Sequence, residues 1–343
     1  MRPGSSIARK FILQLFLLLI FFIVVVTIKG DCTVNEAGTF AYRPDVEAFI
    51  EHMHQKYKMN LSELHDLFLQ VSPRPRTQKT ASRPIKSPNW AYYQRSFLTI
   101  SRINQGVSFW HHYQSILARA SKMYGVPEKI IVAILGMESR YGANTGRYRA
   151  IDSLSTFAFN DPSRSRYFRH ELAQFLLFSK EANLDPLQIQ GSWDGALGWP
   201  QFMPSSARRY AVDMNHDGRR DILNSPEDAI GSVANYFHQQ GWQTWAPVAI
   251  PAIVKKNLPK PVSGTLQSLE LKGIRINTPL PLPADTPVKL IIFQTSAGSE
   301  YWLGFHNLSL LHEYNHSLYY AMVTFELANA IRASYKAQYR TIK

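Results

Sequence analysis

A single glutamate at the end of an apolar helix is the side chain best placed for chemistry in this sequence. Ile131, Ile134 and Leu135 recur at helical spacing, and Glu138 follows on the same stripe. A carboxylic acid that faces the protein interior loses hydration, which raises its pKa and keeps it protonated near neutral pH. The pattern fits a general acid, and equally a helix-end glutamate that only pairs with a basic neighbour such as Arg140.

The residues around Glu138 mark both ends of its helix. Pro127 suits the first helical position, where no backbone N–H is needed, and Glu128 favours the positive N-terminal end. Gly142 can adopt the left-handed conformation that commonly ends helices. We therefore expect a helix that begins near Pro127 and places Glu138 in its last turn.

Three separated motifs carry a resemblance to a known family. The stretch 191–206 combines glycines, two tryptophans and small polar side chains, a composition suited to the wall of a sugar-binding groove. Together with Glu-Ser-Arg-Tyr-Gly at 138–142 and Ile-Gly-Ser-Val-Ala-Asn-Tyr-Phe at 230–237, it resembles the membrane-bound lytic murein transglycosylase B family, bacterial enzymes that cut peptidoglycan. The likeness runs from about residue 35 to the C-terminus. It implies a mainly α fold with a lysozyme-like catalytic core, and a reaction that requires no cofactor.

The resemblance explains how one carboxylate suffices for the reaction. A hydrolase of this type normally needs two, and Asp194, which we interpret as part of a turn, is a possible second carboxylate. In the implied mechanism Glu138 protonates the oxygen that leaves N-acetylmuramic acid, while the sugar's acetamido oxygen stabilises C1. The ionised Glu138 then accepts the proton of the C6 hydroxyl, which closes a 1,6-anhydro ring. The alternatives are a lysozyme-like hydrolase that uses water and a non-catalytic scaffold that binds the wall.

Several groove residues follow from the resemblance alone. They are expected to bind sugars or to orient Glu138, and they are Ser192, Gln201, Tyr236, Asn315 and Tyr320. Arg164 is expected to contact the glycan or its peptide, although Ser163 stands where many members of the family carry a second basic residue. The alternative for Tyr236 and Tyr320 is a buried tyrosine whose hydroxyl has an ordinary protein partner.

A second motif has the pattern of a calcium loop. Oxygen-bearing side chains at alternate positions, followed by glycine, form its opening: Asp213, Asn215, Asp217 and Gly218. Asn224 stands where the usual glutamate would close the loop. The resemblance implies a longer loop that Asp228 closes, with a backbone ligand from Arg219, and therefore a structural Ca²⁺ ion. The alternative is a turn whose carboxylates are merely solvated.

Composition limits the partners of the chain. The formal net charge is +13 over 343 residues, which favours an acidic partner such as the cell wall or a nucleic acid. We expect no nucleic acid, because the sequence contains no zinc-finger spacing or RNA-recognition motif. Cys32 is the single cysteine, so neither an intrachain disulfide nor a cysteine-based metal site is available. The sequence does not identify protein partners.

The N-terminus carries an export or membrane signal. Arg2, Arg9 and Lys10 precede the apolar run 11–28, which reaches the lower limit for a membrane span. We expect a retained anchor in the inner membrane and a periplasmic enzyme; a cleaved signal is the alternative. Lipidation of Cys32 is disfavoured, because the residues at 29–31 are unlike those that a lipoprotein signal requires.

The expected organisation has five parts. Residues 72–88 are basic and rich in proline, which excludes regular helix there, and frequent prolines with a strand at 288–293 mark a change to β structure. The parts are a signal or anchor at 1–32, an N-terminal helical lobe with the basic linker at 33–110, a lysozyme-like core with the EF-hand-like loop at 111–245, a small β-rich lobe at 246–304, and a C-terminal helical segment at 305–343 that returns to the core.

Overall fold

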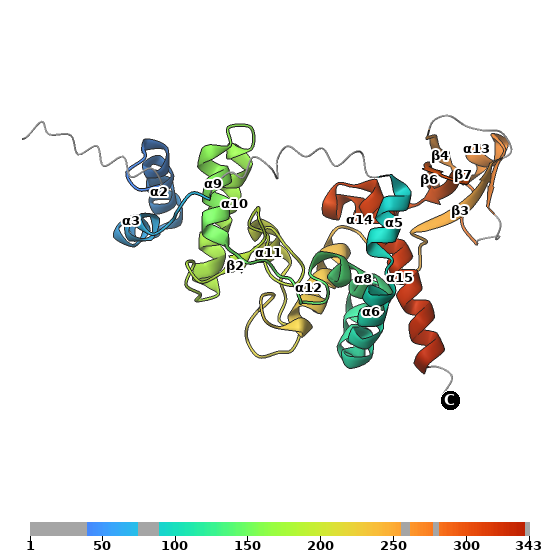
Figure 1. Cartoon of the computed structure of the whole chain (residues 1–343), viewed down its shortest axis with the longest axis horizontal. Coiled ribbons are helices and arrows are strands. Elements are labelled where there is room, and N and C mark those ends of the chain that lie inside the picture. Colours follow the sequence, from blue (N-terminus) through green and yellow to red (C-terminus); the bar gives the residue numbers. More distant parts are fainter. Residues whose placement is uncertain (1–39, 75–88, 255–260, 277–280, 340–343) are drawn as a thin grey trace, which may run out of the picture. The chain divides into compact units, whose positions relative to one another are not determined.

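The computed structural model describes residues 40–74, 89–254, 261–276 and 281–339 and is mainly helical (Figure 1). The helices are α2 (Pro44–Tyr57), α3 (Leu61–Leu69), α5 (Trp90–Phe97), α6 (Ile100–His112), α7 (Gln114–Tyr124), α8 (Glu128–Glu138), α9 (Ala150–Asn160), α10 (Ser165–Glu181), α11 (Pro204–Tyr210), α12 (Pro226–Gln239), α13 (Leu266–Leu271), α14 (His306–Asn315) and α15 (Leu318–Tyr339). The strands are β1 (Tyr148–Arg149), β2 (Gln190–Gly191), β3 (Ala249–Val254), β4 (Ser263–Thr265), β5 (Ile274–Ile276), β6 (Pro287–Thr295) and β7 (Gly298–Gly304).

Helix α8 is a buried helix of the larger hydrophobic cluster. All seven residues from Ile130 to Gly136 are buried, and the helix packs against α6, α7, α12 and α15. A helix that is apolar on every side belongs in a protein interior rather than on its surface. This burial fixes the position of its last residue, Glu138.

A second hydrophobic cluster joins α2 and α3 to α9, α10 and α11. Phe49, Phe68 and Phe159 meet at its centre with ring centroids 5.8 to 6.3 Å apart. Helices α5 and α6, by contrast, contribute buried residues such as Trp90 and Trp110 to the larger cluster around α8. The helices before residue 110 are therefore divided between two cores.

A small antiparallel sheet lies between α12 and α14 in the sequence. Its five strands run in the order β4-β6-β7-β3-β5, and α13 packs beside them (Figure 1). The hairpin of β6 and β7 pairs Leu290 with Leu303 and closes at Thr295 and Gly298. After the sheet, α15 returns to pack against α6 and α8. The predicted fold class is thus confirmed, including the β-rich lobe before the C-terminal helix.

The predicted membrane segment at 11–28 lies outside the described residues. Among the helices that the structure describes, none is both long enough and apolar enough to span a bilayer.

Candidate active site

The turn after α8 holds Glu138 at the end of a buried helix. Buried Ser139 donates its hydroxyl to the Leu135 carbonyl at 3.3 Å and accepts the N–H of Gly142 at 3.0 Å. Arg140 and Tyr141 have the positive φ angles 51° and 60°, which non-glycine residues adopt only when their surroundings impose them. The side chain of Ser139 thus ties the helix end to the turn.

Tyr141 locks this turn against two helices. Its hydroxyl donates to the carbonyl of Arg102 in α6 at 3.0 Å. Its ring lies over Gly136 of α8 and Gly106 of α6, where an added Cβ would lie 2.4 and 2.5 Å from the tyrosine oxygen. Only glycine leaves room for the ring at these points, so the two helices and the turn form one rigid support. This packing sets the direction in which Glu138 points.

The Glu138 carboxyl group is largely enclosed by protein, although the residue retains some solvent exposure. Burial raises its pKa to about 7, and the negative charge of Asp194 acts in the same direction. The buried Tyr320 of α15 donates its hydroxyl to Glu138 Oε1, and this bond opposes the rise because it stabilises the carboxylate. Glu138 is therefore balanced between its acid and its base form near neutral pH.

Two further tyrosines pack against each other, and one of them, Tyr314, lies close enough to Glu138 to be affected by its charge. Tyr314 donates its hydroxyl to the Pro200 carbonyl at 2.7 Å, and burial together with the charge of Glu138 holds its pKa well above the usual value. Tyr236 of α12 lies edge to face with Tyr314 at 4.9 Å between ring centroids, and burial raises its pKa to about 12. The tyrosines are therefore neutral donors at physiological pH. The predicted set did not include Tyr314, although it immediately precedes Asn315 in the same motif.

Two more predicted residues hold the loop after β2. The Ser192 hydroxyl donates to the Asp194 carboxylate and accepts the N–H of Ala196 at 2.9 Å. Gln201 has a φ of 50° and donates its side-chain amide to the carbonyls of Thr145 and Gly198, at 3.0 and 2.7 Å. Both side chains therefore fix local backbone. The Asp194 charge that acts on Glu138 comes from the same loop.

The other two predicted groove residues lie on the surface. Asn315 is exposed at the last position of α14. Arg164 precedes α10 and forms an ion pair with Asp161 at 2.7 Å, with 52% of its side chain exposed. The contacts of Arg164 join it to Asp161 and to the rings of Phe157 and Phe168, and none joins it directly to Glu138.

Sequence reasoning missed a cation that joins the start of the proline-rich segment to the loop after β2. The guanidinium carbon of Arg74 lies 3.5 Å from the ring centroid of Tyr148 and 3.8 Å from that of Trp193. The same group donates to the Ser153 hydroxyl at 2.9 Å and to the Trp193 carbonyl at 3.1 Å. Nothing local in the sequence distinguishes Arg74 from the other basic residues of the segment. Its partners lie far away along the chain.

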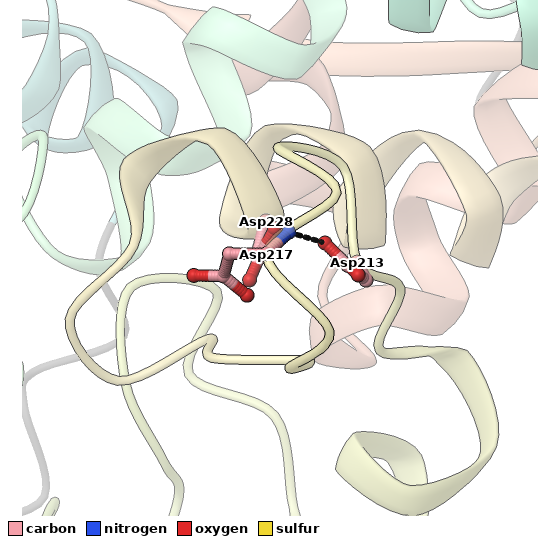
Figure 2. A group of neighbouring side chains, drawn as sticks. All are labelled: Asp213, Asp217 and Asp228. Carbon is pink, nitrogen blue, oxygen red and sulfur yellow. Dashed lines mark hydrogen bonds between the residues drawn. The ribbon is translucent and has the colours of Figure 1, made fainter.

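Three carboxylates converge where the calcium loop was predicted. Figure 2 shows Asp213, Asp217 and Asp228, whose nearest ligand atoms all lie within 4.8 Å of one another. Asp213 accepts the backbone N–H groups of Asp217 at 3.1 Å and of Gly218 at 2.9 Å. Asp228 is fully buried in the first turn of α12, and burial followed by the charge of Asp213 raises its pKa. A cation at this point would offset the repulsion among the three charges.

The remaining loop residues keep the same oxygen-rich chemistry. Asn215 Oδ1 accepts the backbone N–H of Asp217 at 3.1 Å, and the N–H of Arg219 donates to Asp217 at 2.9 Å. Asn224 donates its side-chain amide to the Asp221 carboxylate at 3.1 Å. Carboxylate and carbonyl oxygens are the ligands that calcium prefers, so the residues present fit that ion. Asp228, the closing ligand that the family resemblance implies, lies within reach of Asp213 and Asp217.

Comparison with known proteins gives a consistent result over most of the chain. Residues 41–329 match the family described as the transglycosylase SLT domain. The chain is 36% identical over 305 residues to membrane-bound lytic murein transglycosylase B of Escherichia coli K12. The aligned region covers 86% of this chain and 84% of that protein.

Solved structures agree with this match. Soluble lytic transglycosylase SltB1 from Pseudomonas aeruginosa has a TM-score of 0.80 and 40% identity, over 85% of this chain and 99% of its own. The Escherichia coli lytic transglycosylase Slt35 in complex with calcium has a TM-score of 0.80 and 36% identity, over 87% of this chain and 96% of its own. The family match over residues 41–329 includes the turn after α8, the acidic loop and the first half of α15.

Proposed function

This chain belongs to the transglycosylase SLT domain family of lytic murein transglycosylases, and we propose that Glu138 is its single catalytic acid and base. The observation that carries the proposal is the environment of this carboxyl group. Burial raises its pKa to about 7, and the Tyr320 hydroxyl bonds to it. A group that must first donate and then accept a proton works best when its pKa lies near the working pH.

The reaction proceeds in two proton transfers. Protonated Glu138 donates to the oxygen of the β-1,4 bond between N-acetylmuramic acid and N-acetylglucosamine, and that bond breaks while the acetamido oxygen of the muramoyl residue bonds to C1. The ionised Glu138 then accepts the C6 hydroxyl proton as the C6 oxygen displaces the acetamido oxygen from C1. The product is a 1,6-anhydromuramoyl end, and no water enters. Tyr320 supports the ionised form through its hydrogen bond.

The groove around this carboxyl group would be formed by the residues that the family resemblance implies. We assign sugar binding or the orientation of Glu138 to Ser192, Gln201, Tyr236, Asn315 and Tyr320, and contact with glycan or peptide to Arg164. Ser192 and Gln201 act through the backbone that they hold, since their described hydrogen bonds are to neighbouring loop atoms. Asp194 is exposed and bonded to Ser192, which favours an electrostatic effect on Glu138 over direct attack by its carboxylate.

Replacement of Glu138 by glutamine tests the assignment. Glutamine keeps the size of the side chain and can still accept the Tyr320 hydroxyl, but it cannot donate an acidic proton. We expect Glu138→Gln to lower the rate of murein cleavage by at least about 1000-fold with glycan binding intact, given the usual contribution of a general acid. Asp194→Asn is the matched control and should retain most activity. Cleavage by Glu138→Gln at the unmodified rate would remove this residue from the mechanism.

We further propose that the acidic loop binds Ca²⁺ through Asp213, Asn215, Asp217, Asp228 and the carbonyl of Arg219. The three grouped carboxylates support this assignment, and so does the calcium complex of the Escherichia coli relative. The ion would hold the loop between α11 and α12 without taking part in the chemistry.

The cellular setting follows from the same relationship. We propose that the chain works in the periplasm on peptidoglycan strands, because the Escherichia coli relative is described as membrane-bound and acts on murein. Residues 11–28 would hold the enzyme at the inner membrane.

A further inference from the structure

Arg74 connects the chain after α3 to both α9 and the loop after β2. Its backbone N–H donates to the Thr156 hydroxyl of α9 at 2.9 Å, and its guanidinium donates to the Ser153 hydroxyl of the same helix at 2.9 Å. The guanidinium also donates to the Trp193 carbonyl at 3.1 Å, one residue after Ser192. Ser153 in turn donates to the Ser192 carbonyl at 3.4 Å. Arg74 is therefore fixed to α9 and bonded to the loop backbone.

Two aromatic rings contact the guanidinium of Arg74. Tyr148 belongs to β1 and Trp193 follows β2, and their rings meet at 84° with centroids 5.7 Å apart. The guanidinium carbon lies 3.5 Å from the first centroid and 3.8 Å from the second. A cation is attracted to an aromatic face, and the planar guanidinium can keep its hydrogen bonds at the same time. One side chain thus joins β1 to the loop after β2.

The chain that follows Glu138 packs directly on the backbone of this loop. A Cβ added to Gly146 would lie 2.0 Å from the carbonyl carbon and oxygen of Gly191 and 2.5 Å from the backbone nitrogen of Ser192. Glycine is required for this approach, and its φ of 102° is a conformation that other residues rarely adopt. The position of the loop relative to Glu138 therefore depends on what holds Ser192 against this segment.

We propose that Arg74 is a positioning residue for the transglycosylase reaction. By holding the ring and the carbonyl of Trp193, it keeps residues 192–196, which we call the Ser192 loop, in place against the segment that follows Glu138. The inference rests on the proposed function, which assigns Ser192 to the groove. Inside the loop the Ser192 hydroxyl bonds only to loop atoms among the described residues, so it moves when the loop moves. Arg74 itself has no chemical step.

Steady-state cleavage of soluble murein strands by the full chain tests this role. Arg74→Gln should lower kcat roughly 10- to 100-fold while KM changes less than about twofold, because a displaced positioning group weakens the transition state more than substrate binding. Arg74→Lys should recover part of the loss, since it keeps the charge near the rings without the planar donors. An unchanged kcat in Arg74→Gln would overturn the proposal.

A cycle with Ser192→Ala separates positioning from a general loosening of the fold. Ser192→Ala removes the hydroxyl that orders the loop from inside, so adding Arg74→Gln should lower kcat less than about threefold further. An equal loss with and without the Ser192 hydroxyl would overturn the proposal. If thermal unfolding shows that Arg74→Gln does not fold, Arg74→Lys takes its place in the cycle, and the same non-additivity is expected.

Arg149→Gln is the matched control for attachment. Arg149 donates to the Gln70 carbonyl at 2.9 Å and pairs with Asp152 at 2.7 Å, so it also ties the end of α3 to α9 through bonds that do not involve Trp193. Its kcat should stay within about twofold of the unmodified chain. A loss equal to that of Arg74→Gln would show that attachment alone matters, and would overturn the proposal.

Failure of this inference can be told from failure of the proposed function. Additive losses in the cycle with Ser192→Ala remove the role of Arg74 and leave Glu138 as the acid and base. Cleavage by Glu138→Gln at the unmodified rate removes the proposed function, whatever the Arg74 variants do.

Discussion

The hydrogen bond from Tyr320 to Glu138 makes a quantitative prediction about pH dependence. Tyr320→Phe removes one hydroxyl from a buried ring and leaves its volume nearly unchanged. A hydrogen bond to a charged group contributes about 1.5–3 kcal/mol, and one pKa unit corresponds to about 1.4 kcal/mol. Because the bond favours the carboxylate, its loss should raise the pKa of Glu138 above its value of about 7 by roughly one to two units.

The assay is kcat/KM for murein cleavage measured between pH 5 and 9.5. Activity requires protonated Glu138 at the first step, so the alkaline limb of the profile reports its pKa in the free enzyme. Tyr320→Phe should move this limb upward, whatever it does to the maximal rate. Tyr314→Phe is the matched control, because that hydroxyl donates to Pro200, and its limb should stay near the original pH.

A limb that stays in place in Tyr320→Phe, or moves downward, would refute the reasoning. The first outcome would mean that the bond does not discriminate between the two protonation states. The second would mean that the tyrosine stabilises the protonated form of Glu138.

Three other changes test the supporting structure. Burial raises the pKa of Glu138 from 4.5 to about 7, so ionisation of this carboxyl group lowers the free energy of unfolding as the pH rises through this window. Glu138→Gln removes that cost. The variant should raise the free energy of unfolding, measured in urea, by up to about 3 kcal/mol at pH 8 and hardly at all at pH 4. Gly136→Ala should lower the free energy of unfolding by about 1–3 kcal/mol, because the added Cβ would lie 2.4 Å from the oxygen of Tyr141. The double variant with Tyr141→Ala should lose less free energy of unfolding than the sum of the two single variants, because the clash is then absent. Calcium at about 100 times its dissociation constant for the unmodified chain should add about 2.7 kcal/mol to stability in a melting assay. Exposed Asp217→Asn should weaken that gain at the same calcium concentration, and should not lower the calcium-free stability, because it removes one of three neighbouring negative charges. An equal gain in both chains would exclude this acid as a ligand.

The sequence predicted helix α8 and strand β6 because their signals are local. The apolar stripe before Glu138 and the glycine after it place α8, and the run at 288–293 lies within β6. Other features depend on long-range contacts that no periodicity reveals. Arg74 meets Tyr148 and Trp193 only after the chain has folded.

The candidate site shows the same division. The acid on an apolar stripe could be recognised from spacing, but its partner Tyr320 lies 182 residues away and entered only through family resemblance. The structure brings Glu138, Tyr236 and Tyr320 together through Tyr314, which the predicted set lacked. The Tyr314 hydroxyl donates to the Pro200 carbonyl, 114 residues away along the chain. Residue spacing alone therefore identifies the reacting group better than the groups that shift its pKa.

The most direct test of the central claim is the origin of the new chain end. Peptidoglycan would be digested by the unmodified chain in water enriched in ¹⁸O, and the muropeptides would be weighed by mass spectrometry. Glu138-driven transglycosylation predicts 1,6-anhydromuramoyl products that carry no ¹⁸O and are one water lighter than hydrolytic products. Reducing ends that carry ¹⁸O at C1 would contradict the account, because they would show that water, rather than the C6 hydroxyl, attacks the muramoyl residue.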